Sequence, residues 1–284
     1  MTKLLALETT ETKGSVALCE DGEIKDLRLL RDDQRSAQSL APAIREILGD
    51  NRWLSSDVDV VAAATGPGSF TGLRVGITTA KMLAWAWKTK IVGVDSLDAI
   101  VETYALTERD RFGNAPSVLS VGMDAQRGDA AVRDYLLLSD KSLAIPLHKR
   151  FRIVAIKKWL DVSCDSPYGI LTEEPVDKEM NSGDIVAIPR ILSNMTYSSV
   201  WFAGPAFRRV KDVDEKYPHL QYIPCGEGVP NAAGVALSAW RRVKDDSFDD
   251  VWSILPVYSR CAAAEEKALE KRALAAGSKS VDSH

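Results

Sequence analysis

The chain is poor in the residues that most metal and redox sites need. Its 284 residues include only four cysteines and three histidines, His148, His219 and His284. No two histidines stand at helical spacing, so HExxH and HxxxH are both absent, which argues against a histidine-based metalloprotease. The cysteines are scattered singly, which argues against a CxxC-type zinc site and against a disulfide framework.

The sequence also lacks a strong excess of positive charge and any long apolar run. Its formal net charge is -4, so no broad basic field is available to hold RNA or DNA tightly without a partner. No stretch approaches the length of a membrane span, and the short apolar run at the start is interrupted by Glu8 and has no secretory cleavage site. We therefore expect a cytoplasmic protein with no membrane association.

Hydrophobic patterning over the first hundred residues predicts a mixed sheet with helices. The Asp21-Gly22 pair between two extended runs is a strong hairpin signal. Further strands are predicted at 3–8, 58–64 and 90–94. Helices are predicted at 36–48, 70–88 and 96–106. Three strands in a meander followed by strand–helix–strand crossovers form a mixed sheet with helices on its faces.

The first predicted helix contains a proline, Pro42. Ser36 and Ser39 are both candidate N-caps, and Pro42 favours the later start because proline is tolerated only in the first turn of a helix. Gly49 is expected to end this helix.

A second unit begins near Pro116 and repeats the plan of the first. Its opening predicts a strand, a turn from Asp124 to Gly128 and another strand, in the same order as the start of the chain. Residues 231–243 are predicted helical and 256–260 extended. We expect a first domain over 1–108, a second over 109–260 with an irregular middle, and a helix-prone tail over 261–284.

The stretch ATGPGSFTGLRVG, residues 64–76, joins a predicted strand to a predicted helix. A glycine-rich turn at a helix N-terminus presents backbone N–H groups that can bind an anion. The stretch lacks the GK[ST] of a P-loop, however, and Thr71 stands where GxGxxG needs its third glycine. The alternative is that Ser69 or Thr71 caps the helix while the glycines supply backbone freedom.

Small residues recur at every fourth position of the helix that follows: Gly72, Gly76, Ala80 and Ala84. At about 3.6 residues per turn they form a stripe that lets another backbone approach closely. That close contact is either inside this domain or with a partner chain, and the sequence leaves both open.

Five segments occur in this order along the chain: LLALETT, TGPGSFTGLRVG, VDSL, MDAQRGD and PVYSR. Together they resemble the bacterial TsaB (YeaZ) family, which is related to the proteins labelled glycoproteases. The resemblance covers most of residues 1–105, the start of the second unit and the PVYSR region. It implies an α/β fold of two ribonuclease-H-like halves, as in actin, Hsp70 and sugar kinases, each half a mixed sheet with helices.

The resemblance also implies a role in tRNA modification. Family members act as non-catalytic partners and scaffolds of TsaD, which transfers the threonylcarbamoyl group to adenosine 37 of tRNA, while the ATPase TsaE sustains turnover. The implied partners are therefore TsaD and TsaE, with a homodimer as another assembly and tRNA contacted only through the complex. No cofactor is firmly implied, although ATP or ADP could lie at the partner interface.

The family pattern assigns no catalytic residue and no metal ligand to this chain, because Ser36 stands where many relatives carry histidine. By analogy, the first two helices would form half of an intermolecular four-helix bundle. The expected partner interface consists of Leu40, Ile44, Ile47, Gly72, Gly76, Ala80 and Met82. The candidate nucleotide-binding residues are Thr9, Thr10, Gly68, Ser69 and Thr71.

Three other functions are weighed. A glycoprotease-type peptidase needs a metal or a nucleophile–base pair, which His148 and His219 do not readily supply. An ATP-binding enzyme of the same superfold needs an acidic base and phosphate loops, and Glu8 stands where aspartate is usual there, with FAGPAF at 202–207 a weak adenine-site candidate. The third is a homodimeric scaffold for another client.

Overall fold

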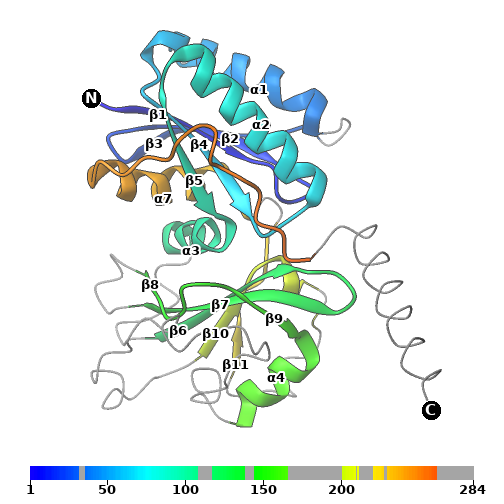
Figure 1. Ribbon diagram of the computed structural model, residues 1–284. Coiled ribbons are helices and arrows are strands. Elements are labelled where there is room, and N and C mark those ends of the chain that lie inside the picture. Colours follow the sequence, from blue (N-terminus) through cyan, green and yellow to red (C-terminus); the bar gives the residue numbers. More distant parts are fainter. Residues whose placement is uncertain are drawn as a thin grey trace, which may run out of the picture.

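The computed structural model describes residues 1–31, 36–107, 117–137, 144–165, 200–208, 210, 220–226 and 229–260. It contains two mixed sheets, one in each half of the molecule, with helix α3 (Ser96–Thr107) between them (Figure 1). None of the described helices has the length and apolar character that a membrane crossing needs.

The first sheet has the strand order β3-β2-β1-β4-β5. Its strands are β1 (Lys3–Glu8), β2 (Ser15–Glu20), β3 (Glu23–Leu29), β4 (Val60–Gly66) and β5 (Lys90–Asp95). The β1–β2 and β2–β3 pairs are antiparallel, whereas β1–β4 and β4–β5 are parallel. The predicted hairpin is confirmed: Asp21 and Gly22 have φ of 50° and 89°, which the two-residue turn between antiparallel strands requires.

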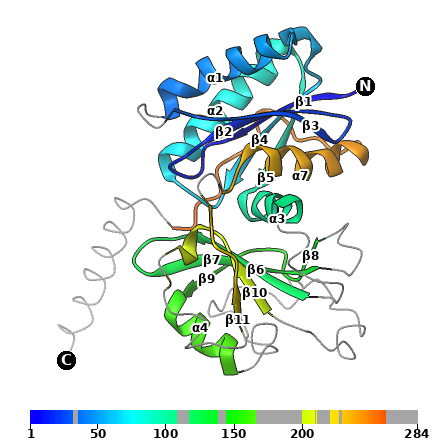
Figure 2. The same cartoon turned by 180° about the vertical axis from the view of Figure 1, so that it is seen from behind.

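Of the described helices, four cover this sheet, two on each face. Helices α1 (Ser36–Asp50) and α2 (Phe70–Trp87) lie on one face, and α3 and α7 (Ala232–Lys244) lie on the other (Figures 1 and 2). The expected late start of α1 and its end at Gly49 are both wrong. Pro42 lies inside the helix, where it removes one hydrogen bond, but the apolar face of the helix is buried and outweighs that loss.

The second sheet repeats the order of the first, as β11-β10-β6-β7-β8, with β9 also paired to β7. The strands are β6 (Ser117–Asp124), β7 (Asp129–Leu137), β8 (Ala144–Pro146), β9 (Arg152–Ala155), β10 (Val200–Ala203) and β11 (Leu220–Tyr222). The antiparallel β6–β7 pair and the parallel β6–β10–β11 pairs match the first half. The predicted α/β fold of two ribonuclease-H-like halves is therefore confirmed.

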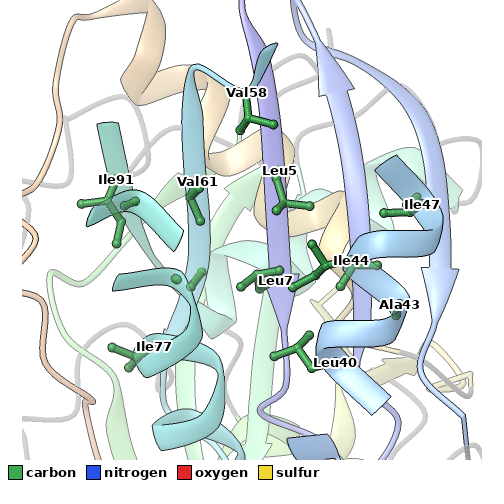
Figure 3. Close-up of a cluster of buried hydrophobic side chains, with 14 of the residues drawn as sticks. Leu5, Leu7, Leu40, Ala43, Ile44, Ile47, Val58, Val61, Ile77 and Ile91 are labelled. Carbon is green, nitrogen blue, oxygen red and sulfur yellow. The ribbon is translucent and has the colours of Figure 1, made fainter. Parts of the chain in front are cut away.

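Alternating side chains of β1 supply two separate cores. Leu5 and Leu7 point toward α1 and α2 (Figure 3), whereas Leu4 and Ala6 pack on the α7 side. Helix α3 joins the halves because its Ala99 packs with the first sheet while Leu97, Ile100, Val101 and Tyr104 pack with the second. The two halves thus share a buried apolar junction.

The structure bears on two expectations about the second domain. Helix α7, expected in the range 109–260, packs on the first sheet, because its buried Ala232, Ala236 and Ala239 allow close contact with an alanine-rich sheet face. The described part of the middle, which was expected to be irregular, contains β8, β9 and helix α4 (Ile156–Asp165), and residues 166–199 lie outside the described residues. The predicted tail 261–284 lies outside the described residues.

Candidate functional site

The glycine-rich turn is a close-packing device inside the first half. A Cβ added at Gly72 would lie 1.8 Å from the backbone oxygen of Thr9, and one at Gly68 would lie 2.5 Å from Cβ of Thr10. At Gly76 it would lie 2.3 Å from Oγ1 of Thr9. The glycines therefore let the first turns of α2 rest directly on the backbone that leaves β1.

Gly66 meets a different neighbour. Its φ is 118°, a region that side chains disfavour, and an added Cβ would lie 2.1 Å from the backbone oxygen of Val257. Val257 in turn donates its N–H to the oxygen of Thr65 at 2.7 Å. The end of β4 is thus closed by a segment almost two hundred residues later in the sequence.

The structure brings most of the candidate nucleotide-binding residues together, but they bond one another. The Thr9 hydroxyl donates to the Gly72 oxygen at 2.7 Å, and the Ser69 N–H donates to the Thr10 oxygen at 2.7 Å. The Ser69 hydroxyl caps α2 by accepting from the Gly72 N–H at 3.3 Å, as the alternative interpretation of the turn predicted. Thr71 is exposed on the first turn, and Gly68 packs on Thr10.

Glu8 is fully buried at the end of β1. Its Oε1 accepts from the Thr10 N–H at 2.7 Å and from the Thr10 hydroxyl, whereas Oε2 has no hydrogen-bond partner in the described structure. Burial raises the pKa of Glu8 to about 8, against the lowering effect of the bonds from Thr10. The Glu8 carboxyl is therefore held by Thr10 within the fold, with one of its two oxygens bonded.

The expected partner interface is largely wrong as a surface. Leu40, Ile44 and Ile47 are buried in the core beneath α1 and α2 (Figure 3). Gly72, Gly76 and Ala80 are also buried, facing the chain's own sheet. Only Met82 is exposed, at 57%. The small-residue stripe thus makes the close contact inside the domain, which the sequence had left as one of two alternatives.

The outer face of α2 is the part that lies open. Along it Phe70, Met82 and Trp85 are exposed, Trp85 to 61%. A neighbouring segment, 249–260, adds Trp252 at 69% and Leu255 at 67% exposure. Large apolar side chains are seldom exposed together on a monomer, and such groupings mark interaction sites. Sequence reasoning missed this surface because helical spacing alone does not say which face of α2 meets the sheet.

Polar contacts also tie the two halves together. Arg133 of β7 lies 2.6 Å from the Asp95 carboxylate and 3.1 Å from that of Asp98. In a second contact between the halves, Arg208 Nη1 donates to Glu11 Oε2 at 2.8 Å. Burial raises the pKa of Asp95 to about 6 although Arg133 acts to lower it. The halves are therefore joined by charged groups as well as by the apolar faces of α3.

Comparison with known proteins places these features in a family. The family model described as TsaD, tRNA N6-adenosine threonylcarbamoyltransferase, matches residues 33–218. The tRNA threonylcarbamoyladenosine biosynthesis protein TsaB of Bacillus subtilis is 35% identical over 126 residues, covering 44% of this chain and 51% of that protein. The chain belongs to the TsaB (YeaZ) family. Its Escherichia coli relative of the same description is 33% identical over 133 residues, covering 47% and 54% of the two chains.

This member of the TsaB family spans about half the length of the curated relatives it matches. The solved structure of YeaZ from Pseudomonas aeruginosa has a TM-score of 0.61 and 20% identity, covering 91% of this chain and 100% of that one. At that identity the likeness shows the fold alone.

The peptidase alternative needs a metal site or a base beside a nucleophile in this TsaB family chain. In the described ranges, no three His, Cys, Asp or Glu side chains form a group that could hold a metal ion. His148 is buried, with Nε2 lying 3.2 Å from Asp134, which also accepts from the Ser120 hydroxyl at 2.5 Å. Asp124 accepts from the Gln126 N–H at 2.7 Å, so it caps its turn. His219 lies outside the described residues.

Proposed function

We propose that this protein is the non-catalytic partner and scaffold of the TsaD threonylcarbamoyltransferase in the modification of adenosine 37 of tRNA. The relatives named as TsaB proteins of threonylcarbamoyladenosine biosynthesis support the pathway. The observation that carries the partner role is the exposed apolar surface of α2, with Met82 and Trp85, in a helix whose opposite face is fully packed. TsaE, tRNA and any nucleotide would be met only in the complex.

The match to the TsaD family model supports a pairing of two chains that share one fold. That match includes residues 33–218, so it contains both α1 and α2. Chains of one fold can associate through equivalent surfaces around an approximate two-fold axis, as identical chains do in dimers. The outer face of α2, and not the buried stripe first expected, is the surface that such a pairing would use.

The local bonding argues against the two enzymatic alternatives. An ATP-binding enzyme would need free hydroxyls and an ionised carboxylate at the end of β1. The hydroxyls of Thr9 and Thr10 already donate hydrogen bonds within the fold, and burial raises the pKa of Glu8 to about 8. A peptidase would need a base beside a nucleophile, whereas His148 is packed against the buried carboxylate of Asp134.

Co-purification with TsaD followed by reconstitution of tRNA modification tests the proposal. We expect the full-length chain to co-elute with TsaD, and modification to fall when the chain is left out. Trp85→Asp should abolish co-elution, while Leu27→Asp, at an exposed site on the edge strand β3, should leave it unchanged. Modification at full rate without the chain would overturn the proposal, as would turnover of a substrate by the chain alone. Stoichiometric zinc would support the peptidase instead.

A further inference from the structure

The 249–260 segment is fixed along the side of α2. Asp249 accepts from the Gly93 N–H at 2.7 Å and from Arg242 at 2.8 Å, which holds the start of the segment on β5. Ile254 is buried in the core beneath α2. Lys81 of α2 donates to the backbone oxygens of Trp252 and Ile254 at 3.2 Å and 3.1 Å. The segment is thus a permanent neighbour of the helix.

This arrangement makes one surface from two distant parts of the sequence. Trp252 and Leu255 stay exposed although Ile254 between them is buried. They stand beside the helix that exposes Met82 and Trp85, because Lys81, one residue before Met82 on α2, holds the segment in place. The apolar surface of α2 therefore continues onto the 249–260 segment.

Arg74 is held in one orientation at the other end of this surface. Its guanidinium carbon lies 3.9 Å from the centre of the Phe70 ring, and its Nε donates to the Tyr258 hydroxyl at 3.0 Å. The Phe70 and Tyr258 rings stack at 4.7 Å. Arg74 is exposed, and among the described residues no carboxylate pairs with it, so its guanidinium is available to bind a carboxylate in the bidentate manner.

The charges around this surface specify the partner's chemistry. Between Asp59 and Asp95 the sequence has no acidic residue, but it has four cations, Arg74, Lys81, Lys88 and Lys90. The segment adds two acidic residues: Asp249 is paired with Arg242, and the Asp250 carboxylate accepts from the N–H groups of Trp252 and Ser253. The cations along α2 and β5 therefore outnumber the one carboxylate of the segment that no cation pairs with among the described residues. A complementary partner would be apolar in the centre and would carry carboxylates at its edge.

We infer that the docking surface extends from α2 over the 249–260 segment and that Arg74 is its ionic anchor, binding a carboxylate on the apolar face of the partner chain. This rests on the proposed function, because the partner is TsaD. The PVYSR motif then has two roles: Val257 closes the end of β4, and Tyr258 orients Arg74. Arginine and tryptophan are the residue types that most often dominate the energy of such interfaces.

Titration of TsaD with the full-length chain at low and high salt tests the inference. Arg74→Glu should weaken binding about 30-fold, the loss typical of a dominant interface residue, and should flatten the salt dependence. Trp252→Ala should weaken binding about 10-fold with unchanged salt dependence. Tyr258→Phe keeps the ring but removes the acceptor of the Arg74 Nε, so it should give a smaller loss than Arg74→Glu.

Lys244→Glu is the matched control for charge, because Lys244 is exposed at the end of α7 on the opposite face of the sheet. It should leave binding unchanged, and thermal unfolding should show that every variant is folded. If TsaD binds but Arg74→Glu and Trp252→Ala bind like the wild type, this inference fails and the proposed function stands. If the wild type does not bind TsaD, the proposed function fails as well. If Arg74→Glu abolishes only self-association, measured by light scattering, a second copy is the occupant and the inference is wrong.

Discussion

Replacing Gly72 with alanine is the sharpest test of how α2 is packed. The new Cβ would lie 1.8 Å from the backbone oxygen of Thr9, far inside van der Waals contact. A backbone oxygen at the end of a buried strand cannot rotate away, so the helix must move. Overpacking of this kind costs about 1–3 kcal/mol, and we place Gly72→Ala at the upper end, about 3 kcal/mol.

The helical preference of alanine offsets part of that cost, by roughly 1 kcal/mol. The expected net loss is therefore about 2 kcal/mol, which lowers Tm by about 4–8 °C for a chain of this size. Gly76→Ala should lose less, because its Cβ would meet the Thr9 hydroxyl, at 2.3 Å, and a side chain can rotate.

Gly49→Ala is the matched control. Gly49 also lies in a helix, α1, but an added Cβ would meet nothing within 4 Å. This variant should be stabilised by about 0.5–1 kcal/mol. The assay is thermal and urea unfolding of the three isolated variants. If Gly72→Ala is as stable as Gly49→Ala, α2 does not rest on Thr9, and the stripe would again be available to a partner.

Two further predictions concern buried charge. The pKa of Glu8 is raised from 4.5 to about 8, so over that pH range the folded state holds a proton that the unfolded state releases. The free energy of unfolding should therefore fall as pH rises from about 4.5 to about 8. Glu8→Gln should remove that part of the pH dependence in urea titrations, and an unchanged profile would show that Glu8 is ionised. Arg133→Met should cost about 3 kcal/mol, because the partly buried Asp95 carboxylate loses its cation, whereas Asp98 keeps the Tyr135 hydroxyl as a donor. A loss below about 1 kcal/mol would show that the pairs are solvent-screened, and Arg150→Met, at an exposed site after β8, is the control.

Local signals in the sequence predicted the elements of the first half well. The Asp21-Gly22 hairpin, the buried β4 and the long α2 follow from turn chemistry and periodicity, which depend on near neighbours in the chain. Pro42 was misread because its local cost was weighed without the burial of Leu40, Ile44 and Ile47 on the same helix. The motif order also identified the family, and the repeated strand order confirmed the fold that the resemblance implied.

By itself the sequence determined which residues share a face of each helix, since that depends only on the pitch of the backbone. It did not determine what each face meets. Only the tertiary structure decided that Gly72 and Gly76 rest on Thr9, that α7 returns to the first sheet, and that Trp252 stands beside α2. Those contacts join residues far apart in the chain, and they are selected by how whole surfaces pack together, which no local pattern encodes.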